Sequence, residues 1–539
     1  MLDYSINYPL ALKYKSFSLI QAIALYYYVK QMKSLTSINR QIGSRRFFLF
    51  ILVFFLFEAV WIALSAVYPQ AFDEDFHFGL IQIYSHHWLP FLSSQPPHAN
   101  AYGAVARDPS YLYHYLMSFP YRLIAHFVHG TIGQVILLRL INVGLFGGGL
   151  ILLRRVLLRV GASPQLTNVS LLLFVLIPIA PQMAAEINYD NLLIPLVGWA
   201  CLLTFQAIDE LKARRPSVRT LLTLLSVCTL SCLVKYEFMP IFLGVVLFLL
   251  FVTYGSFRRK FHLLWSRIWQ DWHRQSKRLK ILLVACVLVS VTLFVQRVGV
   301  NLVRYDAISP DCAVVLSVKD CSAYSVWDHN YTQHQLVLSK AQKVDSNPVT
   351  YLGRWTYWLW YRSFFAVNGP ASSFQNWPPL PLPSAAFGII AIAGITAILK
   401  WRKRIFHNNP YILFLALITV LYLVALLAEG YLVYEYTNVL ELMNGRYLLP
   451  ILPLTAAIVG SAFSVGLRRS PRLKSVFALL AIALFLQGGG FLTFITRSDS
   501  TWDWQNTTVV KVNNAARHIA HPVVLRGRTT YNTPLWFFN

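Results

Sequence analysis

The chain has 539 residues, of which 56% are hydrophobic, 15% aromatic and only 13% charged. This composition lies outside the range of soluble globular domains and inside that of proteins that cross a membrane several times. The formal net charge of +25 would suit a nucleic-acid-binding protein, so the positions of the basic residues decide what this charge means.

Apolar runs of about 17 to 25 residues are long enough to span a bilayer as helices. The sequence therefore predicts an all-α polytopic membrane protein with about eleven spans, which places its two termini on opposite sides. The predicted spans are 47–69, 131–153, 164–185, 192–208, 217–234, 237–255, 281–302, 384–400, 410–430, 447–466 and 475–496.

The basic residues are concentrated in alternate connections between these spans. If the N-terminus is cytoplasmic, the inside segments hold 30 of the 47 Lys and Arg residues and four of the 22 acidic ones, a net charge of +26. The remainder carries 17 basic and 18 acidic residues. This is the asymmetry of the positive-inside rule, and it requires no nucleic acid partner. The basic, Trp-containing segment 256–280 is interpreted as an interfacial helix beside anionic lipid.

No repeat, low-complexity tract or Gly/Ser linker divides the chain into soluble modules. Tyr8–Val29 is interpreted as an amphipathic helix on the cytoplasmic face. Because the outside segments are the long ones, we expect the chemistry there. The predicted parts are a cytoplasmic N-terminal segment (1–46), a transmembrane domain (47–496) with extracytoplasmic loops 70–130 and 303–383, and an extracytoplasmic C-terminal tail (497–539).

Two of the six cysteines, Cys312 and Cys321, lie in the predicted outside segment 303–383. A disulfide closing this short loop suits an oxidising compartment, whereas a zinc site would need more ligands at suitable spacing. The other four cysteines fall within predicted spans, where buried thiols are ordinary packing.

The first predicted span is followed by three carboxylates and a histidine: Asp73, Glu74, Asp75 and His77. Carboxylates are costly near hydrocarbon, so a cluster at a membrane exit usually faces a water-filled cavity and binds something or moves protons. The alternative is a solvated anchor at a helix end. Further along loop 70–130, the patterns of Phe78–Trp88 and Pro109–His129 predict two helices along the outer interface. The Pro- and Gly-containing stretch 93–107 between them is expected to be a mobile loop able to close over a substrate.

These features resemble the GT-C superfamily of membrane glycosyltransferases. Asp73-Glu74-x-x-His77-Phe78 is similar to the Asp-Glu-Pro-x-His-Phe signature of a bacterial family of multispanning membrane proteins, with Asp75 where that family has proline. Three further motifs of this sequence also resemble motifs of that bacterial family: Arg139-Leu140-x-Asn142, Asn188-Tyr189-Asp190 and Gly445-Arg446-Tyr447-Leu448-x-Pro450.

The resemblance implies transfer of a sugar from a polyprenyl-phosphate donor to a glycan, lipid or protein acceptor of the cell envelope. Transfer would occur on the outer face of a bacterial cytoplasmic membrane, with inversion at the anomeric carbon. Such a reaction needs one base opposite a leaving phosphate. Asp73 is the first candidate for this base and Glu74 the second, with Asp75 as a neighbouring substrate-binding residue. His77 would orient a carboxylate or donate to phosphate; alternatively, it is an interfacial histidine bonded to backbone.

The leaving phosphate requires cationic donors at the outer face. Arg446 is the preferred one, because a guanidinium at the edge of a span can bind phosphate bidentately; the alternative is snorkelling to the headgroups. Lys235 ranks lower, since it lies beside Glu237 and would form a local ion pair. Arg107 in the first outside loop is a further candidate.

Glu186 and Asp190 lie four residues apart at the outer end of the third predicted span. They would form a second acidic wall that holds a metal with Asp73 or contacts acceptor hydroxyls, or they are a solvated helix end. Asp73, Glu74 and Asp190 carry the oxygen ligands that Mg²⁺ or Mn²⁺ prefer, but their spacing is not diagnostic of a metal site. Arg139, within a span, is expected to have a structural role and to pair with an acid in the bundle interior.

Two other classes of function stay open. A proton-coupled transporter or flippase of envelope lipids or glycans would use the acidic cluster for coupling, although such proteins commonly show repeats and polar sites at the bilayer midplane. A non-catalytic subunit of a polymer-assembly complex is the other. No phosphate-binding glycine loop, metalloprotease His pair or nucleophile elbow is present.

Overall fold

The computed structural model of the chain describes residues 39–520, except for a few short gaps. The predicted amphipathic helix 8–29 and the final part of the C-terminal tail, 521–539, lie outside the described residues. The gaps are residues 93, 259–260, 342–343, 345–346, 365–366, 371–373, 376–380, 408, 468–469, 489–493 and 496–497.

The part of the chain that the structure describes is helical, apart from one antiparallel pair of two-residue strands, β1 (Val367–Asn368) and β2 (Phe374–Gln375). The predicted all-α class is confirmed. Within these residues, six helical stretches are long and apolar enough to cross a membrane, as expected for an integral membrane protein. They are α2 (Arg45–Ser65), α5 (Thr131–Arg159), α8 (Asp190–Lys212), η2 with α10 (Tyr236–Phe238 and Met239–Phe257), α12 with η3 and α13 (Lys277–Phe294, Val295–Gly299, Val300–Tyr305), and α19 (Pro410–Thr437).

Helices also occupy the other five predicted spans, at least in part. Three of them are shorter apolar helices, and the total of eleven spans stays a prediction. These helices are α6 (Pro164–Val175), α9 (Val218–Val234), α18 (Pro381–Phe406), α20 (Leu452–Gly466) and α21 (Pro471–Gly488).

The predicted continuous span 164–185 is wrong, because the helix breaks in the middle. α6 begins normally, with Ser163 accepting a capping bond from the Leu166 amide and Pro164 at its start. It ends at Val175, and a short second helix, α7 (Ile179–Ala184), follows. Pro178 explains the break, since it lacks an amide hydrogen and disfavours helical backbone in the residue before it.

Helices α5 and α8 pack closely at the centre of the molecule. A Cβ atom on Gly149 of α5 would lie 2.6 Å from the Ile194 side chain, and one on Gly198 of α8 would lie 2.9 Å from Leu152 Cβ. Because both contacts are closer than real Cβ atoms allow, glycine is needed at each position. This packing fixes the ends of α5 and α8 that lie toward α3, from which several polar side chains of the site project.

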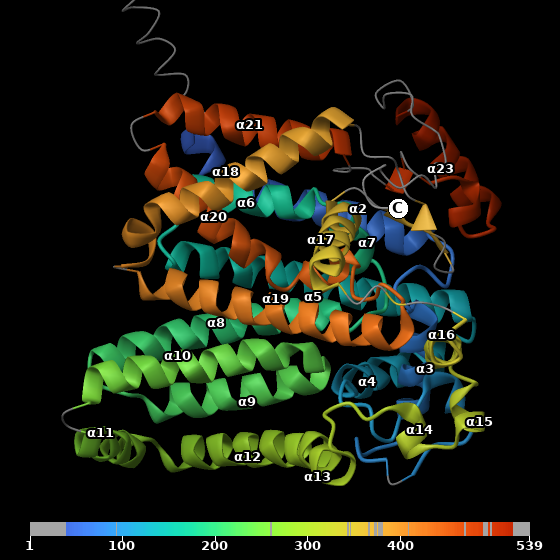
Figure 1. The fold of residues 1–539 in the computed structure, drawn as a ribbon, viewed down its shortest axis with the longest axis horizontal. Helices are drawn as coiled ribbons and strands as arrows, with labels where there is room; N and C mark the ends of the chain where they lie inside the picture. Colours follow the sequence, from blue (N-terminus) through green and yellow to red (C-terminus); the bar gives the residue numbers. More distant parts are fainter. Residues whose placement is uncertain are drawn as a thin grey trace, which may run out of the picture.

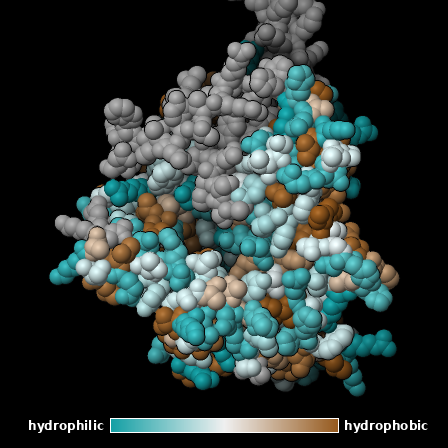
Figure 2. Space-filling model, turned by 90° about the vertical axis from the view of Figure 1, so that its right-hand side faces the viewer, coloured by the Kyte–Doolittle hydropathy of each residue, from teal (hydrophilic) through white to brown (hydrophobic). Residues whose placement is uncertain are grey.

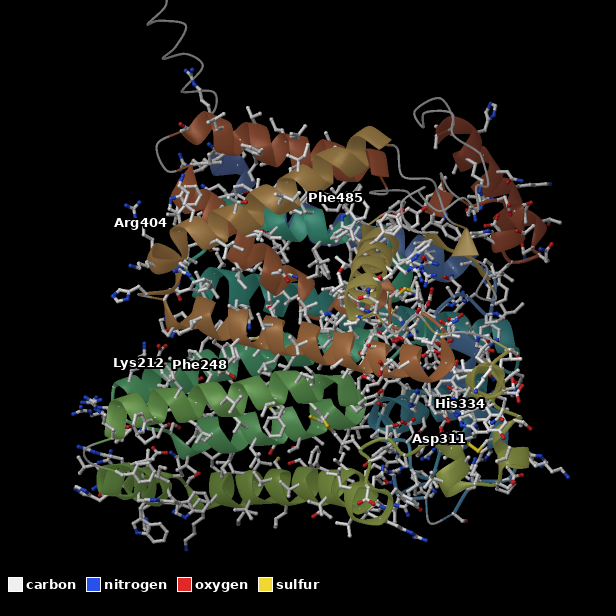
Figure 3. All side chains as sticks on the ribbon, viewed as in Figure 1. Lys212, Phe248, Asp311, His334, Arg404 and Phe485 are labelled. Carbon is white, nitrogen blue, oxygen red and sulfur yellow. A yellow bond between two sulfur atoms is a disulfide. The ribbon has the colours of Figure 1, made fainter. Side chains whose placement is uncertain are left out.

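The two ends of the helix bundle differ in character. Lys212 and Arg404 lie at one end, together with α11 (Phe261–Arg274), whereas Asp311 and His334 lie at the other (Figures 1 and 3). This second end is formed by the short helices of the segments predicted to lie outside, and the part of its surface that is coloured mixes hydrophilic with hydrophobic residues (Figure 2). The predicted basic connections and the long segments therefore gather at opposite ends; the cellular side of each end stays a prediction. The short elements at or near the second end are α3 (Glu74–Ser85), η1 (Asn100–Tyr102), α4 (Leu112–Phe127), α14 (Cys312–Val315), α15 (Val318–Cys321), α16 (Ser325–Leu338), α17 (Pro348–Phe364), η5 (Gly445–Leu448), η6 (Ser500–Trp502) and α23 (Thr507–Ala520).

Candidate functional site

The chain passes from α2 to α3 through a turn in which Phe72 and Asp73 both adopt left-handed backbone, with φ of 59° and 67°. For residues with a side chain this conformation costs on the order of 1 kcal/mol or more each, and it persists only where neighbours fix it. The carbonyl oxygen of Phe72 accepts hydrogen bonds from Asn188 Nδ2 and Arg446 Nη1, both at 3.0 Å. These two side chains therefore hold the strained turn in place.

Asp73 forms an ion pair with Arg446, with 2.9 Å between Oδ2 and Nη2. The Asp73 side chain is 44% exposed, whereas that of Arg446 is 11% exposed. Asp73 precedes α3, but its carboxylate makes no capping bond. Arg446 is positioned by η5, which packs on α17 so closely that a Cβ on Gly445 would lie 2.4 Å from Ser363 Cα. The structure thus brings together the first-choice base and the preferred phosphate ligand, which are far apart in sequence.

Glu74 lies next to Asp73 but is fully buried against Arg139 of α5. Nε and Nη2 of Arg139 donate to the two carboxylate oxygens at 2.7 and 2.6 Å. The backbone amides of Gln70 and Ile187 donate to the same carboxylate. Arg139 also donates to three carbonyl oxygens at the end of α2, those of Ala63, Ala66 and Val67. The expected structural pairing of Arg139 with an acid is therefore present, and its partner is the second-choice base.

A C-terminal segment clamps the end of α2 from the other side. The Trp504 amide donates to the Ser65 carbonyl oxygen at 2.9 Å, and the Val67 amide donates to that of Trp502 at 2.8 Å. The residue between the two tryptophans, Asp503, is fully buried and accepts from both Nη atoms of Arg517. No pattern in the sequence predicts that Asp503 lies beside α2, because the two are more than 400 residues apart.

Lys235 and Asp190 form a second buried ion pair. Lys235 Nζ lies 2.9 Å from Asp190 Oδ1 and 3.0 Å from Glu237 Oε2, so the predicted local pair with Glu237 is only part of its environment. Burial alone would lower the pKa of Lys235, but the two carboxylates outweigh it and raise that pKa well above its ordinary value. The ammonium group also lies 4.7 and 4.9 Å from the rings of Tyr189 and Tyr447. Its positive charge is thus already balanced.

Glu186 differs from Asp190, its expected partner in an acidic wall. The side chain is fully buried, and neither carboxylate oxygen has a hydrogen-bond partner among the described residues. Burial raises the pKa of Glu186 well above its ordinary value, and the negative charge of Glu74 adds to the rise. Glu186 therefore favours its protonated form, whereas Asp190 is ion-paired.

The carboxylates expected to hold a divalent cation do not converge. Within the described ranges, no group of three or more His, Cys, Asp or Glu side chains is arranged to bind a metal ion. Glu74 is fully engaged by Arg139, Asp190 is paired with Lys235, and Asp73 is paired with Arg446. The three residues do not fit a shared Mg²⁺ or Mn²⁺ site.

His77 pairs with a histidine that sequence reasoning missed. Its Nδ1 lies 2.8 Å from Nε2 of His114 on α4, and the two buried rings are nearly parallel, at 16°. Burial lowers the pKa of both imidazoles, to about 3 for His114. The pair is therefore neutral at ordinary pH, which leaves each ring one N–H donor, and donation from His77 to phosphate stays a prediction. Asp75, two residues earlier, is exposed.

Arg107 belongs to the loop that was expected to be mobile, and this loop is tied down at several points. Arg297 Nη1 donates to the carbonyl oxygens of Val105 and Asp108, and Asn301 Nδ2 donates to that of Arg107. Within the described residues, no hydrogen bond or ion pair joins Arg107 to Asp73 or Arg446. The role of Arg107 as a phosphate ligand therefore stays a prediction.

Cys312 and Cys321 are joined by a disulfide that holds α14 to α15. Just beyond Cys321, Tyr324 stacks on Phe76, with 5.8 Å between ring centroids. Tyr324 also lies close to Gly103, where a Cβ would be 3.0 Å from its ring. The disulfide-bonded segment therefore covers the start of α3 and the first outside loop.

No protein-family model matches the sequence, and no curated protein matches it either. Among solved structures, the chain is similar to the Archaeoglobus fulgidus oligosaccharyltransferase in its apo form, with 12% identity and a TM-score of 0.41 over 91% of this chain and 62% of that one. The same archaeal enzyme tethered to an acceptor peptide containing the NVT sequon gives 11% identity and a TM-score of 0.39, covering 91% and 61% of the two chains. Its complex with an inhibitory peptide and a dolichol-phosphate gives 13% identity and a TM-score of 0.38, covering 90% of this chain and 61% of that one. The chain spans less than two thirds of that enzyme's length, and these values assign it neither a family nor a function.

Proposed function

We propose that the protein is an inverting membrane glycosyltransferase that moves a sugar from a polyprenyl-phosphate donor to an envelope glycan, lipid or protein. The reaction takes place at the end of the bundle that carries α3, on the extracytoplasmic face of a bacterial membrane. The N-terminus is then cytoplasmic and the C-terminus extracytoplasmic, as the distribution of basic residues predicts.

The observation that carries this proposal is the half-exposed carboxylate of Asp73 in contact with the nearly buried guanidinium of Arg446. A displacement at an anomeric carbon needs a base for the acceptor hydroxyl and a cation for the leaving phosphate. Asp73 is the carboxylate of the cluster that combines access to solvent with a strained, fixed backbone. Arg446 supplies a fork-shaped cation suited to phosphate oxygens.

In the proposed step, Asp73 takes the proton of the acceptor hydroxyl while the hydroxyl oxygen forms a bond to the anomeric carbon. The bond between that carbon and the carrier phosphate oxygen breaks on the opposite face, and the phosphate leaves with the electron pair. Because a single displacement exchanges the two faces, the product has inverted configuration. The proton on Asp73 then passes to water, to which this side chain is exposed.

The carrier phosphate takes hydrogen bonds from Arg446 as it gains negative charge. In the unliganded protein, Asp73 occupies one of these donors. Phosphate binding therefore separates the ion pair and releases Asp73 to act as a base. This exchange delays activation of the base until a donor is present.

The other acidic residues have supporting roles in this proposal. Glu74 is a positioning residue: its bonds to Arg139 and to the Ile187 amide fix the turn that presents Asp73. Lys235 and Asp190 neutralise each other and orient Tyr189 and Tyr447 beside Arg446. In this proposal Asp73 is therefore the base, and Glu74, the second candidate, holds it in position.

The test uses the purified full-length chain in lipid nanodiscs, with polyprenyl phosphates carrying labelled sugars and an envelope extract as acceptor. Asp73→Asn is expected to lower transfer by at least about a thousandfold, since it removes the base but keeps the side-chain shape. The matched control is Asp306→Asn, an exposed residue with left-handed backbone, which asparagine tolerates well. Normal transfer by Asp73→Asn would remove this residue from the mechanism.

One observation favours a second function, a proton-coupled lipid or glycan transporter. Glu186 is a buried carboxyl group that favours its protonated form, close enough to Asp73 and Arg446 for their charges to act on it. A transporter needs such a group to bind and release a proton. In the same nanodiscs, sugar that never leaves its carrier would favour this function. In sealed vesicles, the matching result is carrier lipid that crosses the membrane only under a proton gradient.

A further inference from the structure

Helix α11 (Phe261–Arg274) lies at the opposite end of the bundle from α3 and the Asp73 site (Figure 1). The proposed chemistry gives it no role. α11 connects α10 to α12, and it is held to the bundle along one side only. Leu264 is its buried residue, and the Asp271 carboxylate accepts a hydrogen bond of 2.8 Å from the Val218 amide at the start of α9. These two contacts fix how the helix is rotated about its own axis.

Three aromatic residues form a stripe along a second side of α11. Phe261, Trp265 and Trp269 are four residues apart, and they are 55%, 67% and 65% exposed. At about 100° per residue, this spacing puts the three side chains on one face of the helix. Tryptophan and phenylalanine exposed in this way are typical of a helix that lies in the interface between headgroups and acyl chains.

Basic residues occupy a third side. Arg267 and Arg274 are exposed, and the same geometry places them about 160° to 180° from the middle of the aromatic stripe. Three more basic side chains, Lys277, Arg278 and Lys280, follow within six residues. Segment 261–280 contains these five basic residues and one acidic residue, Asp271, a formal charge of +4. Asp271 lies one helical turn from both arginines, but its carboxylate accepts from the Val218 amide, and no ion pair joins it to either arginine among the described residues.

We propose that α11 lies in the membrane surface and binds anionic phospholipids through Arg267 and Arg274. The aromatic stripe enters the boundary between headgroups and acyl chains, and the basic side chains meet the lipid phosphates. Charge complementarity selects anionic over zwitterionic headgroups, because a positive side chain gains energy only where the surface potential is negative. The helix thereby anchors the basic end of the bundle, independently of any activity at the other end.

The experiment uses the full chain with one reporter on α11. The exposed Gln270 is replaced by cysteine (Gln270→Cys) in a Cys286→Ser background, since Cys286 is the exposed free cysteine. An environment-sensitive fluorophore attached to the introduced thiol is measured in nanodiscs that contain brominated phosphatidylglycerol or brominated phosphatidylcholine at equal mole fraction. The expected result is stronger quenching by the brominated phosphatidylglycerol.

Two double variants test which residues cause this preference. Arg267→Gln/Arg274→Gln should make the quenching by the two lipids nearly equal. Each lost basic side chain should lower the preference for the anionic lipid roughly fivefold. Arg402→Gln/Arg404→Gln is the matched control, because it removes the same charge from exposed positions at the end of α18. The control should keep the preference. Equal quenching by both lipids in the unsubstituted helix would overturn the proposal, as would an equal loss of preference in both double variants.

Discussion

Arg139 of α5 holds Glu74 of α3 through both carboxylate oxygens, at 2.7 and 2.6 Å, and neither side chain reaches solvent. Breaking a buried ion pair by neutralising one partner leaves the other charge without compensation. We expect Glu74→Gln to lower the free energy of unfolding by about 3 kcal/mol, measured by thermal or denaturant unfolding in detergent. Neutralising one partner of an exposed pair, as in Arg159→Gln opposite Asp209, should cost about 1 kcal/mol or less. Equal losses in the two variants would contradict the role assigned to Glu74.

The disulfide between Cys312 and Cys321 predicts a change in the number of reactive thiols. In denaturant without reductant, a maleimide should add to the four free cysteines, Cys201, Cys228, Cys232 and Cys286, because unfolding exposes the three that are buried. After reduction in the same denaturant, two further adducts should appear, at Cys312 and Cys321. Intact-protein mass spectrometry counts them directly. Six adducts before reduction would show that the two cysteines are not paired in the purified protein.

Because Glu186 is buried and favours its protonated form, we expect the free energy of unfolding to fall as pH rises. Burial raises its folded pKa well above the value of 4.5 expected for an unfolded carboxyl group. Above pH 4.5, the folded state therefore holds a proton that the unfolded state has lost, so raising the pH toward the folded pKa reduces stability. Melting temperatures between pH 4 and 9 should show a smaller fall in Glu186→Gln than in the parent. Parallel curves would mean that Glu186 does not hold this proton.

For the His77–His114 pair we expect the opposite dependence: the free energy of unfolding should fall as the solution becomes more acidic. Burial lowers the folded pKa of His114 to about 3, against 6.5 for an unfolded histidine. As pH falls from 6.5 toward 3, the unfolded state gains protons that the folded state rejects, and stability decreases. His114→Gln should reduce this acid sensitivity in melting experiments, whereas the exposed control His129→Gln should leave it unchanged. If both variants behave alike, the histidine pair is not the cause.

The sequence predicts which residues of the candidate site lie at one end of the bundle better than it predicts how they are paired. Asp73 and Arg446 are recognisable because each adjoins a predicted span on the same side. Glu74 looks equivalent to Asp73 in sequence, yet Asp73 has left-handed backbone just before α3, whereas Glu74 is the first residue of that helix and is buried against Arg139. Pairings such as His77 with His114 depend on tertiary packing, which no local periodicity encodes.

The error in the third predicted span has a different origin. Hydropathy over 164–185 is continuous, so a count of apolar residues predicts one helix. Pro178 was a visible signal against it, because proline removes a backbone donor within the helix. The separate turn after α7 carries Glu186 and Asn188 to the site, where Asn188 Nδ2 donates to the Phe72 carbonyl oxygen. A count of apolar residues over 164–185 predicts neither the break nor this contact.

The ion pair between Asp73 and Arg446 predicts that loss of activity and loss of carrier binding are separable. A carrier phosphate competes with the Asp73 carboxylate for the same guanidinium. Asp73→Asn removes the competing charge, so it should bind polyprenyl phosphate without sugar about fivefold more tightly than the parent, the range expected for a partly exposed ion pair. Arg446→Lys should bind it more weakly, because an ammonium group cannot form the bidentate contact.

Titration of the detergent-purified chain with polyprenyl phosphate measures both effects, with Asp306→Asn as the control for a change of one charge at the same end. Tighter binding by Asp73→Asn together with lost transfer would support both roles of the carboxylate. It would then compete with the carrier phosphate for Arg446 before the reaction, and take the proton of the acceptor hydroxyl during it. Unchanged binding would show that Arg446 meets the phosphate without releasing Asp73. Weaker binding would mean that Asp73 itself contributes to holding the carrier.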